Sequence, residues 1–199
     1  MADQHPNSEI PAYHPGFEYP LSHFSDRFNR PGLVKVVAIG SSSTAGEGGV
    51  APYPRRLELA LRDPHSWPDG ADKFKHRVID VINRGKGGDE ARAELDRFRE
   101  DVIDEKPSLV IWQVGPNAVW KTYDLGDVVS AIDMDLKLLL ANDPGMDVVL
   151  MDLQYAPALL SDNRIKEAER MVVHFARRCG ESTCESFPAV RPDAQMARD

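Results

Sequence analysis

Two patterns of apolar and polar positions alternate along the chain, one typical of buried strands and the other of helices. Four short runs are almost continuously apolar, as central parallel strands covered on both faces are; they span residues 33–40, 77–82, 109–114 and 147–151. Apolar residues at spacings of three, four and seven predict helices over 54–62, 89–105, 128–141 and 163–178. This order predicts an α/β fold, a three-layer α/β/α sandwich around a parallel sheet of four to five strands.

The two ends of the chain lack this periodicity. Residues 1–31 are rich in Pro, His and aromatic residues and predict an extended N-terminal arm, in which 21–28 could form a short helix packed on the domain. Residues 32–178 form the predicted domain. Residues 179–199 predict an irregular C-terminal tail with at best a short edge strand at 187–190. A clear fifth strand and a final helix are therefore missing from the predicted fold.

Composition and charge restrict the possible partners. A chain of 199 residues can bury one full core, and a net charge of -8 with a pI near 5.3 argues against nucleic acid or an anionic membrane as partner. No apolar run approaches the roughly 20 residues that span a bilayer. Residues 1–19 lack a signal-peptide apolar region, so a cytoplasmic location is expected. Cys179 and Cys184 could form a disulfide or half a metal site, but free thiols are favoured.

Three polar or glycine-bearing turns directly follow three of the predicted strands. They are Gly40-Ser41-Ser42-Ser43-Thr44, Asn83-Arg84-Gly85 and Gly115-Pro116-Asn117. Because the carboxyl ends of parallel strands meet at one edge of a sheet, we expect these turns to form a single site. Ser42 is the candidate nucleophile, and its backbone N–H, the Gly85 N–H and the Asn117 side chain are candidate donors to an oxyanion.

The three turns resemble the first three sequence blocks of the SGNH (GDSL-type) hydrolases. Gly40 to Thr44 looks like the block that carries the serine nucleophile, although Ser41 replaces the usual aspartate. The resemblance implies a flavodoxin-like sheet, acyl transfer from a small-molecule ester to Ser42, and no need for a metal or cofactor. It also implies that Gly85 and Asn117 complete the oxyanion hole.

The fourth block of that family, Asp-x-x-His, does not occur in this chain. In the family, its histidine is the general base that deprotonates the serine. His174 falls within the helix predicted over 163–178 and is not at the expected place. We therefore expect a chain truncated or frameshifted after about residue 175. An active serine esterase and an impaired or inactive domain, acting at most as a binding module, are both compatible with the sequence. The oligomeric state does not follow from it.

Simpler interpretations exist for several of these residues. The segment 40–49 could be an ordinary strand-to-helix turn with a serine cap, and Asn83 a turn residue bonded to its own backbone. A phosphate-binding loop is disfavoured, because no Gly-Lys-Ser/Thr follows the first turn. Trp112 and Trp120 are expected to serve packing, although Trp120 could line the cleft. The acidic residues of 89–105 are expected to form a solvated helix face; they include Asp89, Glu90, Glu94 and Asp101.

Overall fold

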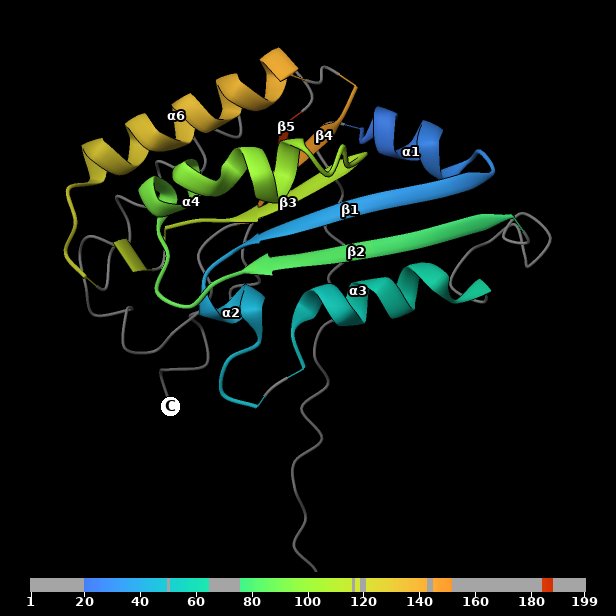
Figure 1. Ribbon diagram of the computed structural model, residues 1–199, viewed down its shortest axis with the longest axis horizontal. Coiled ribbons are helices and arrows are strands. Elements are labelled where there is room, and N and C mark those ends of the chain that lie inside the picture. The colour runs from blue at the N-terminus through green and yellow to red at the C-terminus, as the bar shows by residue number, and fades with distance from the viewer. Residues whose placement is uncertain are drawn as a thin grey trace, which may run out of the picture.

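A parallel five-stranded sheet in the order β2-β1-β3-β4-β5 lies at the centre of the computed structural model (Figure 1). This is the flavodoxin-like order, and it confirms the predicted α/β sandwich. The structure describes residues 20–49, 51–64, 76–115, 117–118, 121–142, 145–151 and 184–187. The strands are β1 Gly32–Gly40, β2 Arg77–Gly85, β3 Leu109–Gln113, β4 Asp147–Met151 and β5 Cys184–Phe187.

Helices cover both faces of the sheet. In Figure 1, α4 and α6 lie on one side of the strands and α3 lies on the other. The described helices are α1 Ser22–Phe28, α2 Ser42–Ala45, α3 Tyr53–Arg62, α4 Ala91–Phe98 with the following π-helical turn η3 Arg99–Ile103, and α6 Leu125–Asn142. Among the described residues, none of these helices has the length and apolarity needed to cross a membrane.

Two apolar clusters fill the spaces between these layers. The larger one packs α4, η3 and α6 on β1, β3 and β4, and fully buried Phe98 and Trp112 meet edge to face within it. The smaller one packs α1 and α3 on the opposite face around Phe28, Leu61 and Ile79. Trp112 is thus a packing residue, as predicted, whereas Trp120 lies outside the described residues.

The observed elements differ from the predicted ones mainly at their ends. The helix predicted over 89–105 begins at Ala91 and finishes as the π-helical turn η3, while α6 begins three residues before its predicted start. The short helix α2 was not among the predicted helices. A fifth strand does exist, at Cys184–Phe187 rather than at 187–190, and it pairs in parallel with β4. The division into arm, domain and tail stays a prediction, and the helix predicted over 163–178 lies outside the described residues.

The prediction of a solvated acidic face over residues 89–105 was wrong for three residues. Asp89, Glu90 and Glu94 are only 9%, 7% and 1% exposed. Glu94 faces the sheet, where the Trp112 Nε1 donates a hydrogen bond of 2.6 Å to its carboxylate. A buried indole N–H needs an acceptor, and this need explains why a carboxylate replaces an apolar side chain here. Burial nevertheless raises the pKa of Glu94 to about 7.

A contact between distant parts of the chain holds α1 on the domain. No side chain of its own segment caps α1 at its N-terminus, and the Phe24 N–H instead donates to the carboxylate of Asp147 at 2.8 Å. His23 Nδ1 lies 3.0 Å from the other oxygen of the same carboxylate. Asp147, at the first position of β4, therefore supplies the negative charge that favours a helix N-terminus. This arrangement confirms the short helix expected within the arm.

Candidate active site

Ser42 is placed at the carboxyl edge of the sheet, at the first position of α2. The strand β1 ends at Gly40, where a Cβ would lie 2.4 Å from Thr44 Oγ1 and 2.9 Å from the Gln113 carbonyl oxygen, so that only glycine fits. Gly46, with a φ of 83°, ends α2 after one turn. The Ser42 side chain is half-buried, and none of the described residues forms a hydrogen bond with its hydroxyl.

Side-chain hydrogen bonds tie the turn after β1 to its two neighbours. The Asn83 Nδ2 on β2 donates to the Thr44 carbonyl oxygen at 2.8 Å. The Thr44 hydroxyl donates to Gln113 Oε1, at the end of β3, at 2.9 Å. The backbone adds a third link, since the Lys86 N–H donates to the Gly40 carbonyl oxygen at 2.9 Å. The hydroxyl-rich turn is therefore held from both sides.

The turns after β2 and β3 are also bonded to each other. The Asn117 Nδ2 donates to the Asp89 carbonyl oxygen at 2.9 Å, and the Lys121 Nζ donates to the Gly88 carbonyl oxygen at 2.6 Å. The turn after β1 is thus hydrogen-bonded to the segment after β2 and to the last residue of β3, and the segments after β2 and β3 are bonded to each other. The structure brings the segments that carry Ser42, Gly85 and Asn117 together at one edge of the sheet.

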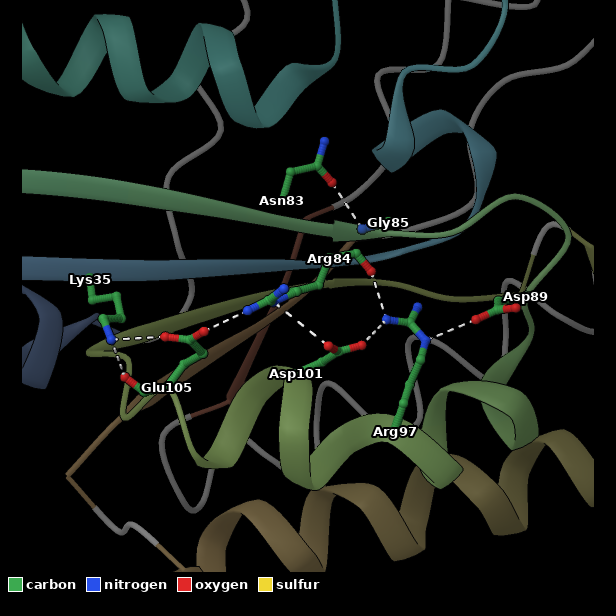
Figure 2. Close-up of polar contacts among 8 residues, drawn as sticks. All are labelled: Lys35, Asn83, Arg84, Gly85, Asp89, Arg97, Asp101 and Glu105. Carbon is green, nitrogen blue, oxygen red and sulfur yellow. Dashed lines mark hydrogen bonds and ion pairs between the residues drawn. The ribbon is translucent and has the colours of Figure 1, made fainter.

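Gly85 is packed more tightly than its expected role requires. Its N–H donates to Asn83 Oδ1 at 2.9 Å (Figure 2). A Cβ at Gly85 would lie 2.2 Å from the Ala45 backbone nitrogen, so the residue lets β2 approach α2 closely. To act as an oxyanion donor, the Gly85 N–H would have to exchange its bond with Asn83. The simple interpretation of Asn83, that it bonds its own turn, is confirmed.

Gly88 is a further candidate donor that the sequence did not single out. It occupies the second central position of a turn closed by the Asp89 N–H donating to the Lys86 carbonyl oxygen at 3.2 Å. Its φ of 80° is the left-handed conformation that a type II turn requires at this position. The Gly88 N–H donates to none of the described residues. The glycine pair at 87 and 88 was the available signal, because only glycine adopts this conformation without strain.

A buried carboxylate lies beside the third turn. Burial raises the pKa of Glu90 to about 7, although the nearby backbone N–H of Ala118 and the Lys121 ammonium favour its charged form. The backbone N–H of Asn117 also faces this carboxylate. Glu90 therefore contacts the same segment whose side-chain amide is bonded to Asp89. Within the described residues, no three His, Cys, Asp or Glu side chains group as a metal site would require.

A comparison with models of protein families shows to which family the chain belongs. Residues 38–199 match the family model of the GDSL-like lipase/acylhydrolase family. The chain belongs to this family. The match begins within β1, includes all three turns and runs through the segment predicted as a tail.

Solved structures of a lipolytic protein and of an esterase have the same fold. A protein of the G-D-S-L lipolytic family from Desulfitobacterium hafniense is 26% identical, with a TM-score of 0.62 over 81% of this chain and 82% of the other. The acetylxylan esterase Axe2 from Geobacillus stearothermophilus is 24% identical, with a TM-score of 0.55 over 76% and 74%. A curated acetylxylan esterase from the same organism is 45% identical over 47 residues, which are 24% of this chain and only 22% of the esterase.

The described histidines of this GDSL-like protein lie away from the three turns. Of six histidines in the chain, the structure describes His23 and His76. His23 contacts Asp147 at the start of β4, and the His76 carbonyl accepts the Gly32 N–H at the start of β1. Both therefore belong to the amino edge of the sheet. Within the described residues, no histidine is placed to deprotonate Ser42, and His174 lies outside them.

Proposed function

We propose that this protein hydrolyses small carboxylic esters by acyl transfer to Ser42. The observation that carries the proposal is the set of hydrogen bonds that joins the segments after β1, β2 and β3 at one edge of the sheet, with Ser42 at the start of α2. Membership of the GDSL-like lipase/acylhydrolase family supports the reaction class. The names of the similar acetylxylan esterases suggest acetylated sugars as the first natural esters to test. A cytoplasmic location remains part of the proposal.

The proposed chemistry divides into two steps. The Ser42 oxygen attacks the acyl carbonyl, the bond to the alcohol breaks, and water then releases the acyl group from Ser42. The charge on the carbonyl oxygen is held by the backbone N–H of Ser42, a glycine N–H of the second turn, and the Asn117 side chain. Asn117 Nδ2 carries two hydrogens, and its bond to Asp89 uses only one of them.

Two glycines, Gly85 and Gly88, are candidates for the backbone N–H donor to the oxyanion. Gly85 was expected from the sequence, but its N–H is bonded to Asn83. Gly88 lies three residues further along the same turn, and its N–H is not used by the described residues. We favour Gly88 for this reason. A Gly85→Ala variant cannot decide between them, because its methyl group would collide with the α2 backbone whatever the role of Gly85.

A catalytically impaired domain that binds esters is the second candidate function. It is favoured by the position of both described histidines at the amino edge, which leaves no described base for Ser42. Loss of one member of a catalytic triad typically leaves a rate about 10³–10⁴-fold above that in water. The two functions therefore differ by orders of magnitude in rate.

Hydrolysis of p-nitrophenyl acetate tests the proposal. The full chain is expected to exceed the buffer rate, and Ser42→Ala is expected to remove that excess. Ser43→Ala is the matched control, because Ser43 is the next residue of α2 and is half-buried like Ser42. Equal rates for the wild type and Ser42→Ala would contradict the esterase proposal and favour the impaired domain.

A further inference from the structure

A continuous chain of charged side chains crosses one face of the sheet and ends at the second turn. Figure 2 shows it running from β1 and β2 to η3 and α4; its members in order are Lys35, Glu105, Arg84, Asp101, Arg97 and Asp89. All of these side chains are at least partly buried. The first three links join β1 and β2 to η3 and to Glu105, which follows it, and the last link reaches the candidate site.

Arg97 binds the second turn at both of its ends. Its Nη1 donates to the Arg84 carbonyl oxygen at 2.8 Å, directly before Gly85. Its Nε donates to Asp89 Oδ2 at 2.8 Å, at the other end of the turn. Its Nη1 also donates to Asp101 Oδ2, one helical turn further along, at 2.5 Å. One planar guanidinium therefore fixes the separation between the start and the end of the turn, which a single ammonium group could not do.

Asp89 connects Arg97 to the third turn through hydrogen bonds. Its carboxylate is bound by Arg97, while its own backbone carbonyl accepts the hydrogen bond from Asn117 Nδ2. The next residue, Glu90, faces the backbone N–H groups of Asn117 and Ala118. The Asn117 side-chain amide is thus held by the Asp89 carbonyl, and the Asn117 backbone faces the Glu90 carboxylate. The Asp89 residue is in turn held by Arg97, whose side chain is only 16% exposed.

We propose that Arg97 is a positioning residue, which holds the second turn so that the Asp89 carbonyl aims the Asn117 amide at the reacting carbonyl oxygen. The role assigned here to Asn117 rests on the proposed esterase function. The bond from Asn117 to Asp89 and its dependence on Arg97 do not. Arg97 itself contacts no substrate in this account, and it acts only through the geometry of the turn.

A simpler role for Arg97 is that of a half-buried ion pair that stabilises α4 on the sheet. The two roles differ in what Arg97→Lys does. A stabilising charge is largely retained by lysine, whereas the simultaneous grip on the Arg84 carbonyl and the Asp89 carboxylate is lost. Lys86 offers a matched control, since its Nζ lies 3.9 Å from the same Asp89 carboxylate but its side chain is 69% exposed. Lys86→Gln should leave the turn in place.

Solvent exchange of the Asn117 side-chain amide, measured by NMR, tests the proposal without any need for turnover. Asn117→Asp identifies the signals by removing them. The wild type and Lys86→Gln should show a protected Asn117 amide hydrogen, and Arg97→Lys should speed its exchange by about tenfold or more. Asp89→Asn, which keeps the carbonyl but weakens the grip of Arg97, should give an intermediate rate. The Asp89→Asn variant also provides the test if Arg97→Lys fails to fold. Unchanged exchange in a folded Arg97→Lys or Asp89→Asn variant would overturn the proposal.

Kinetics extend the test where turnover dependent on Ser42 is found. Arg97→Gln should lower kcat by about tenfold or more with little change in KM, because the donor is displaced and not removed. In an Asn117→Ala background, the same substitution should have no further effect. Multiplicative effects would show that Arg97 acts independently of Asn117. Absence of turnover dependent on Ser42 would count against the esterase function, while the exchange experiment would still decide the role of Arg97.

Discussion

The two edges of the sheet are both held by side chains that reach between distant segments, but they use their polar groups differently. At the amino edge, Asp147 accepts hydrogen bonds from α1, and Lys35 pairs with Glu105. At the carboxyl edge, Asn83 and Asn117 bind backbone carbonyls and lock three turns together. Within the described part of the chain, Ser42 and Gly88 keep polar groups there that make no hydrogen bond.

This difference separates groups that stabilise the fold from groups that can do chemistry. A charged pair whose members satisfy each other contributes to the free energy of unfolding and has no capacity left for a ligand. A turn held by its neighbours' amides can present a hydroxyl and backbone N–H groups at fixed positions, which is what stabilisation of a transition state requires. Substitutions at the carboxyl edge should therefore change activity, and those at the amino edge should change stability.

Asn117→Ala is expected to have the largest effect among these tests. It removes the proposed oxyanion donor and the link to Asp89, and should lower kcat by about 10²–10³-fold. Asn142→Ala is the matched control, because its Nδ2 also donates to a backbone carbonyl, that of Leu138, at the end of α6. Steady-state hydrolysis of p-nitrophenyl acetate by the three proteins measures the difference. An Asn117→Ala variant that keeps nearly full kcat would place the oxyanion elsewhere.

Asp147→Ala should show the opposite behaviour at the amino edge. It leaves the Phe24 N–H and His23 without their acceptor and should lower the free energy of unfolding by about 2 kcal/mol, with kcat unchanged at a temperature where the protein stays folded. Asp26→Ala, on the exposed side of the same helix, should stay within about 0.5 kcal/mol of the wild type. Urea unfolding provides the comparison. A loss of activity without loss of stability would contradict the division between the edges.

Asp135→Asn tests a buried carboxylate that belongs to neither edge. Burial raises the pKa of Asp135 to about 8, and the nearby Glu94 and Asp96 carboxylates act in the same direction. The folded protein therefore keeps a proton that the unfolded chain loses near pH 4, so the free energy of unfolding falls as pH rises from about 4 to 8. The asparagine variant should gain stability relative to the wild type over that range, by at most about 1.4 kcal/mol per pH unit.

Urea unfolding of the wild type and Asp135→Asn at pH 5, 6.5 and 8 measures this gain. Asp127→Asn, an exposed substitution on the same helix, is the control. Curves for Asp135→Asn that run parallel to the wild type would show that Asp135 is not held protonated in the folded state.

Lys35→Gln should give the smallest effect. Lys35 and Glu105 are each 23% exposed, and the loss of such an ion pair should cost about 0.5–1 kcal/mol. The hydrogen bond from Lys35 lowers the pKa of Glu105, with help from Arg84. That contribution is present above the pKa of an unfolded glutamate and is lost as pH falls below it. The cost of Lys35→Gln should therefore be smaller at pH 3 than at pH 7, as thermal unfolding at the two pH values would show.

The strands and the three turns could be predicted because their signals are local. A continuous apolar run such as that of β1 reports burial on both faces, and the glycine or polar residue that follows it reports where the strand ends. Ser42, Gly85 and Asn117 were placed at one edge by this argument alone. The family resemblance then gave the site its expected chemistry, and the match to the GDSL-like family confirms that resemblance.

What the sequence could not show depends on partners distant in the chain. Asp147 caps a helix 123 residues away, and Glu94 is buried because it accepts from Trp112 on another element. The Gly85 N–H was predicted to be available, but the Asn83 side chain reaches it two residues away. Composition and periodicity predict the exposure that a residue type usually has. They do not predict the individual hydrogen-bond partner that makes a residue such as Glu94 depart from that usual exposure.

Covalent labelling of the full chain with a fluorophosphonate, located by mass spectrometry of its peptides, tests the central claim most directly. The account predicts a single adduct on Ser42, absent from Ser42→Ala, retained in Ser43→Ala and formed more slowly in Asn117→Ala. An adduct on Ser43 or another residue, or labelling no faster than that of the urea-unfolded chain, would contradict the claim that the three turns build one nucleophilic site.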